Sequence, residues 1–156
     1  MIRLNLLNVG IVDETDAILL VLQAPELAQL LVIETGPLEG QAVALEAEGV
    51  RSERPLTHDL THEMIQALGA RVAEVQIGDL DEETFYAKVV LVRAVDGANR
   101  MEFDARPSDA IALALRAGAP IYASDAVMDE AGIPVERNGR FEALYEDDPV
   151  ENGTIH

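Results

Sequence analysis

The stretch from residue 101 to residue 118 places a strand pattern, a proline and an apolar helix pattern in direct succession, and it restricts the possible fold more than any other. Apolar and polar residues alternate from Met101 to Arg106, which is the period of a strand with one buried face. Pro107 suits the first position of a helix, where a missing backbone N–H costs nothing. Residues 110–115 are apolar on every side of a helical wheel, so the sequence predicts a buried helix.

The same succession occurs once more, seventy positions earlier. Pro37 begins an alanine-rich stretch that corresponds to the one after Pro107, and Glu39 stands at the position that corresponds to Asp109. Only two such copies fit the chain, which favours a duplicated unit over a solenoid. We therefore predict an α+β fold built on a duplicated β-β-β-α unit, with a mixed or antiparallel sheet and alanine-rich buried helices.

The length of 156 residues suits one domain with a substantial core. We assign residues 1–134 to this domain and expect residues 135–156, where the hydrophobic pattern fades, to form an acidic, flexible tail. The sequence has no long uncharged apolar run and no cationic leader before an apolar core, so we expect no membrane span and a cytoplasmic location. The lack of cysteine excludes disulfides and thiolate metal ligands.

The charge of the chain limits how it can bind nucleic acid. It has 29 acidic residues against 11 lysines and arginines, which gives a net charge of -18. Proteins that hold a phosphate backbone by bulk electrostatics have the opposite balance. Binding of RNA or DNA would therefore need divalent cations or a local arginine patch, and Arg51 and Arg54 form the densest basic pair of the chain.

Four polar residues gather at the corner between the strand and the helix of the 101–118 stretch, namely Asp104, Arg106, Ser108 and Asp109. The N-terminus of a helix carries partial positive charge, which makes this corner a candidate site. The same residues also have a purely structural interpretation. Asp109 can accept backbone N–H groups as part of a helix cap, and Arg106 can pair with Asp104.

A further helix is predicted from His58 to Leu68. Its apolar residues share one face, and His58 and His62 fall on the opposite face, so we expect both histidines to be exposed to solvent. The apolar face consists of Leu60, Met64, Ala67 and Leu68.

The residues from His58 to His62 weakly match the zinc-protease pattern of two histidines and an acid on one helix. Asp59 is shorter than the glutamate that this chemistry uses, and no third histidine follows before His156. A metal cluster of another type, formed by His58, Asp59, His62 and Glu63, fits these residues better.

Carboxylates at Glu39, Asp59, Asp104 and Asp109 are candidate ligands for Mg²⁺ or Mn²⁺, because such hard cations prefer oxygen ligands. Cleavage of a phosphodiester by two metal ions needs several carboxylates of this kind. A chain with 29 acidic residues groups some of them by chance, so the spacing alone does not decide the question.

Four separated segments resemble the bifunctional nuclease family in the same order along the chain. They are IETGPLEGQA at 33–42, RPLTHDL at 54–60, DL at 79–80 with TFYA at 84–87, and DARPSDAIAL at 104–113. The resemblance covers about residues 1–133 and implies a compact α+β domain that cleaves RNA and DNA. The polar positions that match are Glu39, His58, Asp59, Arg106, Ser108 and Asp109, whereas His62 lies outside the matching positions.

The residues and the resemblance together predict a nuclease that hydrolyses phosphodiester bonds of RNA or DNA with the help of a divalent metal. Glu39, Asp104 and Asp109 are the candidate metal ligands. His58 is the candidate general acid or base, because the ordinary pKa of histidine lies near neutrality, and Asp59 joins it as a catalytic candidate. Arg106 would stabilise the charge of the phosphorane, and Ser108 would orient it.

The alternative is a non-catalytic regulatory or assembly module that binds a protein partner. In that case the polar corner would be a helix cap. For either function we expect a homo-oligomer.

Overall fold

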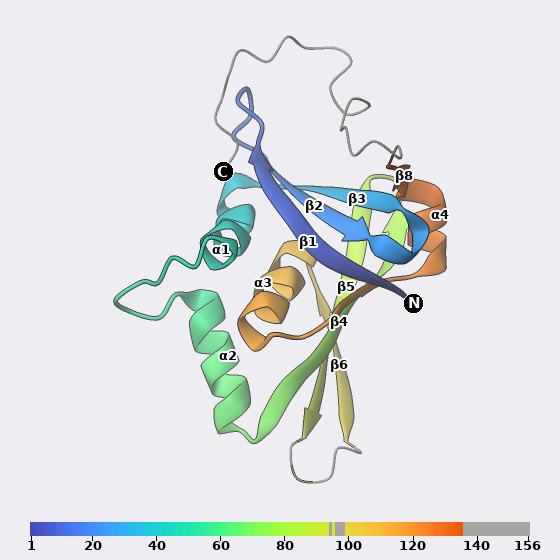
Figure 1. Cartoon of the computed structure of the whole chain (residues 1–156). Coiled ribbons are helices and arrows are strands. Elements are labelled where there is room, and N and C mark those ends of the chain that lie inside the picture. Colours follow the sequence, from blue (N-terminus) through green and yellow to red (C-terminus); the bar gives the residue numbers. More distant parts are fainter. Residues whose placement is uncertain (94, 96–98, 136–156) are drawn as a thin grey trace.

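A computed structural model describes residues 1–93, 95 and 99–135 of the chain (Figure 1). The strands are β1 (Ile2–Ile11), β2 (Ile18–Ala24), β3 (Gln29–Thr35), β4 (Ala70–Asp81), β5 (Thr84–Arg93), β6 (Arg100–Ala105), β7 (Ile121–Ala123) and β8 (Ile133–Pro134). The helices are α1 (Pro37–Ala47), α2 (Thr57–Ala67), α3 (Pro107–Ala117) and α4 (Asp125–Ala131), with a 3-10 turn at Pro25–Leu27. Of the predicted tail, residues 136–156 lie outside the described residues.

The strands of the described residues form one sheet of eight, in the order β6-β5-β4-β7-β1-β2-β3-β8. Neighbouring strands are antiparallel except β4 and β7, which are parallel. The predicted α+β class with a mixed sheet is therefore confirmed. The order β-β-β-α occurs as β1-β2-β3-α1 and again as β4-β5-β6-α3, and the two sets of strands lie on either side of β7. An origin of the two units by duplication stays a prediction.

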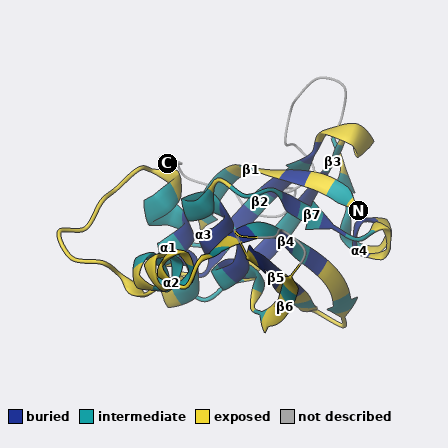
Figure 2. Cartoon of the chain, turned by 90° about the horizontal axis from the view of Figure 1, so that it is seen from below, coloured by how far each residue is buried: buried dark blue, intermediate teal, exposed yellow. Residues whose placement is uncertain are grey.

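Helix α3 is buried against the sheet, as its composition predicts. Its buried residues include Ser108 and every residue from Ala110 to Ala114. Helix α1 buries only Gly40 and Val43, so the burial predicted for both alanine-rich helices is found for six of the 11 residues of α3 and for only two of the 11 residues of α1. Figure 2 shows the buried residues gathered where α3 meets the strands, with α1 and α2 forming the more exposed outer side.

A glycine allows α1 to lie close to the sheet. A Cβ atom at Gly40 would come within 2.5–2.7 Å of side-chain atoms of Ile18 and Thr35, so any larger residue would push the helix away from β2 and β3. Helix α1 also packs against α3, and the two helices lie on the same side of the sheet (Figure 1). This packing brings the two proline-initiated helix ends into one region.

Helix α2 contradicts the expected exposure of the histidines. The side chain of His58 is only 17% exposed, and His62 has an intermediate exposure. Leu60, Met64 and Leu68 are instead exposed by 50%, 55% and 81%. The helix therefore has the opposite orientation to the predicted one, because its histidine side makes polar contacts with α3 that a helical wheel does not represent.

The helices α1, α2 and α3 have 11 residues each. No helix among the described residues is long and apolar enough to cross a membrane.

Candidate functional site

The N-terminal turns of α1 and α3 have the same local design. In each helix a proline occupies the first position and an acidic residue the third, which gives Glu39 in α1 and Asp109 in α3. The residue before each proline has extended backbone angles, as a residue preceding proline must. The repeat in the sequence therefore places two equivalent carboxylates at two equivalent helix ends, where the helix dipole favours negative charge.

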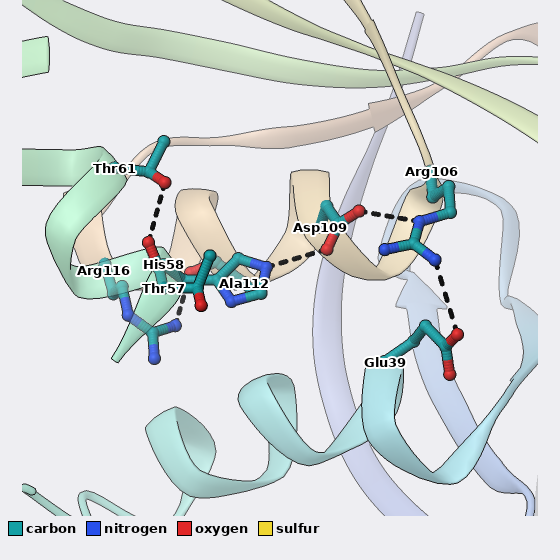
Figure 3. A network of polar contacts seen from close by, with 8 residues as sticks. All are labelled: Glu39, Thr57, His58, Thr61, Arg106, Asp109, Ala112 and Arg116. Carbon is teal, nitrogen blue, oxygen red and sulfur yellow. Dashed lines mark hydrogen bonds and ion pairs between the residues drawn. The ribbon is translucent and has the colours of Figure 1, made fainter. Parts of the chain in front are cut away.

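Arg106 joins the two carboxylates. Its Nε donates to Oδ2 of Asp109 at 2.9 Å, and its Nη1 donates to Oε1 of Glu39 at 3.4 Å (Figure 3). The pairing of Arg106 with Asp104, which the sequence left open, is not the one found. The hydrogen bond and the charge of Asp109 raise the pKa of the Arg106 guanidinium, so this side chain stays positively charged.

The two helix ends share one arginine because the corresponding position in α1 is a glycine. Gly36 precedes Pro37 as Arg106 precedes Pro107. A Cβ atom at Gly36 would collide with the Glu39 carboxylate. The missing side chain thus leaves the Glu39 carboxylate room beside its own helix end, from which it reaches Arg106.

His58 reaches the same cluster from α2. Its Nε2 lies 2.8 Å from Oδ1 of Asp109, and the two side chains are 17% and 28% exposed. An ionised carboxylate can only accept a hydrogen bond, so in this contact Nε2 carries the proton and Nδ1 is the remaining basic nitrogen of a neutral ring. Figure 3 shows His58, Asp109, Arg106 and Glu39 in one continuous chain of contacts.

Asp59 faces a different partner. Its Oδ1 accepts from Nε of Arg116 at 2.6 Å, and its Oδ2 accepts from the backbone N–H of Leu56 at 2.9 Å. The hydrogen bond from Arg116 and, after it, the bond from Leu56 hold the pKa of Asp59 below its ordinary value. Asp59 therefore stabilises the start of α2 and fixes it to α3, and its part in catalysis stays a prediction.

Arg116 is the residue of this region that the sequence interpretation missed. Its side chain is only 5% exposed, it also donates to the carbonyl of Ala112 at 3.1 Å, and it lies 3.9 Å from Glu46 of α1. A signal was present, because Arg116 follows Asp109 by seven residues, two helical turns, and is the one charged residue in the last turn of an apolar helix. It connects all three long helices behind the contact of His58 with Asp109.

The other predicted residues are not joined to this cluster. Asp104 is exposed on β6, opposite Lys88 in the strand register. Ser108 is buried with 3% exposure, and its hydroxyl makes none of the side-chain hydrogen bonds found among the described residues. Among the described residues, no three or more His, Asp or Glu side chains are placed to hold one metal ion. The set of His58, Asp59, His62 and Glu63 is therefore not such a group.

The cluster carries more negative than positive charge. Glu39 and Asp109 contribute two negative charges, against the one positive charge of Arg106. The Arg106 side chain is 65% exposed and therefore accessible from solvent. An anion could therefore bind the exposed guanidinium of Arg106. The imidazole of His58, which Asp109 orients, lies in the same cluster.

Comparisons with known proteins find similarity over the part of the chain that contains the cluster. A family model described as the bifunctional nuclease domain matches residues 20–136, which include every residue of the cluster. An uncharacterized protein of Mycobacterium tuberculosis is 45% identical over 78% of this chain and 71% of its own length. Bifunctional nuclease 2 of Oryza sativa subsp. japonica is 33% identical over 70% of this chain and 37% of its own length. Bifunctional nuclease 2 of Arabidopsis thaliana is 28% identical over 85% of this chain and 42% of its own length.

Proposed function

This chain belongs to the bifunctional nuclease family, and from that premise we propose that it hydrolyses phosphodiester bonds of RNA, DNA or both. The observation that carries the proposal is the continuous contact of His58, Asp109, Arg106 and Glu39. This cluster combines an acid or base with a group that binds phosphate, which are the two functions that phosphodiester hydrolysis requires.

In the proposed reaction Asp109 orients the imidazole of His58. The carboxylate holds Nε2–H, so Nδ1 is the atom that takes a proton from the attacking water or gives one to the leaving oxygen. Arg106 binds the phosphate oxygens through its planar, permanently charged guanidinium. Glu39 keeps Arg106 at the mouth of the site.

We also propose that Mg²⁺ or Mn²⁺ assists the reaction. A phosphate would add negative charge to a cluster that already has an excess of it, in a chain of net charge -18, and a divalent cation would offset that charge. Glu39, Asp109 and the exposed Asp104 are the carboxylates we assign to it. Because Arg106 already occupies the space between Glu39 and Asp109, these residues do not form a ready metal site, and we assign no chemical step to the ion.

The proposal is tested by digestion of labelled RNA and DNA with the wild-type chain in Mg²⁺, in Mn²⁺ and in chelator. We expect cleavage of at least one substrate. If the wild type cuts neither RNA nor DNA with either ion, the proposed nuclease function is wrong. If cleavage persists in chelator, only the proposed role of the metal is wrong.

Two pairs of variants test the site itself. We expect His58→Ala and Asp109→Asn each to lower the rate by about 10²–10⁴-fold, since acid–base catalysis contributes about that much. His62→Ala, on the same helix, and Asp129→Asn, exposed on α4, are the matched controls, because neither side chain is in the cluster or assigned to the metal. A rate for His58→Ala equal to that of wild type would show that the cluster is not catalytic.

The second candidate function is an assembly module without catalysis, and the exposed apolar side of α2 favours it. Intact substrate under all metal conditions, together with a specific association, would be the result that supports it.

A further inference from the structure

The loop between α1 and α2, residues 48–56, is exposed at every position, and Figure 1 shows it projecting between the two helices. It contains Arg51 and Arg54, the densest basic pair of the chain. Their two positive charges equal the negative charges of Glu48 and Glu53, so the loop is neutral and the net charge of -18 is carried by the rest of the chain. A phosphate is therefore repelled less at this loop than at an average part of the surface.

The two loop arginines make no ion pair within the part of the chain that the structure describes. Arg100, Arg106 and Arg116 each pair with a carboxylate, as an arginine easily does in a chain with 29 acidic residues. The guanidinium groups of Arg51 and Arg54 thus remain available to a ligand. A planar, permanently charged guanidinium suits the oxygens of a phosphate.

Arg54 lies close to the candidate site along the chain. It precedes His58 by four residues, and four residues span at most about 14 Å. His58 contacts Asp109, which in turn binds Arg106. Successive phosphates of a strand are at least about 3.4 Å apart along its axis, so about four nucleotides are enough to cover the distance from the loop to the site.

Arg51 lies near the start of the same helix. The pKa of Asp59, in the first turn of α2, is lowered first by the hydrogen bond from Arg116, next by the backbone N–H of Leu56, and further by the charge of Arg51. Exposed charges that are more than about 10 Å apart are largely screened from each other. Both loop arginines therefore lie at the end of α2 that carries the catalytic candidate His58.

The other end of the contact chain, at Glu39, is acidic. A Cβ atom at Gly36 would collide with the Glu39 carboxylate, and Gly36 also lines an open pocket of about 760 Å³. The same pocket is lined by three glutamates, which are Glu34, Glu82 and Glu83. A nucleic-acid strand carries one negative charge per nucleotide and is repelled on this side, so the loop is the more favourable direction for it.

We propose that Arg51 and Arg54 bind the phosphates of a nucleic-acid strand next to the phosphate that Arg106 binds. The inference rests on the proposed nuclease function and specifies its substrate. The substrate is a strand of RNA or DNA that extends by several nucleotides beyond the reacting bond, so a dinucleotide lacks the phosphates that the loop binds.

The first test compares the cleavage of a strand of about twelve nucleotides with that of a dinucleotide. We expect Arg51→Ala with Arg54→Ala, the loop variant, to lower kcat/KM on the long strand by about 10- to 100-fold, mainly through a higher KM. The dinucleotide has no phosphate beyond the reacting one, so its cleavage should not change. An equal loss on both substrates, or no loss on either, would overturn the inference.

The double variant Arg71→Ala with Arg93→Ala is the matched control, because it removes the same charge elsewhere. Both side chains are exposed, on β4 and β5. Arg93 lies six residues along β5 from Ala87, which pairs with Ala105 beside Arg106, so about 20 Å of strand separates it from the cluster. The control should cut both substrates as the wild type does, and circular dichroism checks that each variant is folded.

The second test measures binding without cleavage, by fluorescence anisotropy of the labelled long strand in Mg²⁺, with every chain carrying His58→Ala. The loop variant should bind at least about 10-fold more weakly, and its salt slope should be smaller by about 1.4, since each phosphate contact on a single strand contributes about 0.7. Glu53→Gln removes a negative charge from the loop and should bind more tightly.

The binding data separate this inference from the nuclease function. If the wild type cuts neither substrate but the binding differences appear, the nuclease function is wrong and the loop still binds the strand. If the wild type cuts the long strand but the loop variant binds it as tightly and with the same salt slope, only the role of the loop is wrong.

Discussion

Helices α3 and α2 have the same length, and each provides one side chain of the contact between Asp109 and His58, yet their surroundings are opposite. Six residues of α3 are buried, and none of α2 is. Helix α3 is held by apolar packing against the sheet and α1, whereas α2 is held to α3 largely by polar side chains. One half of the candidate site is therefore rigidly fixed, and the other half depends on a few charged contacts.

This difference predicts where the fold is sensitive. Ile111 of α3 is fully buried, so Ile111→Ala should lower the free energy of unfolding by about 2–5 kcal/mol through lost burial and the cavity left behind. Ile65 of α2 packs against the core but is only partly buried, and Ile65→Ala should cost about 1 kcal/mol. Urea unfolding of the two variants compares them directly. Equal losses would mean that α2 is anchored by apolar packing after all.

The next largest effect concerns Arg116, which holds α2 through Asp59. Arg116→Met keeps the apolar part of the side chain and removes a charge-assisted hydrogen bond, so we expect a loss of about 1–3 kcal/mol. Hydrogen exchange should locate the loss, with faster exchange in α2 and little change in α3. Arg116→Lys, which keeps the charge, is the matched control, and its free energy of unfolding should lie between those of wild type and Arg116→Met. A uniform increase over both helices would contradict a local role.

The two helices also show how far the sequence predicts the site. The start of α3 is predicted by Pro107, and its burial is predicted by the six consecutive apolar residues at 110–115. The offset of seventy relates Glu39 to Asp109, and both lie at the third position of a helix. Arg106, Asp109 and His58 were candidates from the sequence, and the structure brings them together. The orientation of α2 could not be obtained in this way. A helical wheel ranks apolar residues only, and the contact that sets the orientation joins Asp59 to Arg116, which is 57 residues away.

A smaller effect is expected in the pH dependence of the free energy of unfolding, to which Asp59 contributes by holding α2 against α3. In the folded chain the pKa of Asp59 lies below its ordinary value of 3.8, mainly because of Arg116. The unfolded chain then binds a proton more readily, so the stability that Asp59 adds is present above about pH 4 and is lost as the pH falls through the lowered pKa. For a partly exposed pair we expect less than about 1 kcal/mol. Unfolding of wild type and Asp59→Asn between pH 3 and 7 measures it, and parallel curves for the two chains would refute it.

The smallest effect is expected on the exposed apolar side of α2, where Leu60 lies. Leu60 is half exposed, so Leu60→Gln removes little buried area and should change the free energy of unfolding by less than about 0.5 kcal/mol. A glutamine at Ile111 of α3 would instead bury an unpaired amide, because Ile111 is fully buried. Urea unfolding of Leu60→Gln beside wild type measures the difference, and a loss as large as that of Ile111→Ala would mean that this side of α2 is covered in the folded chain.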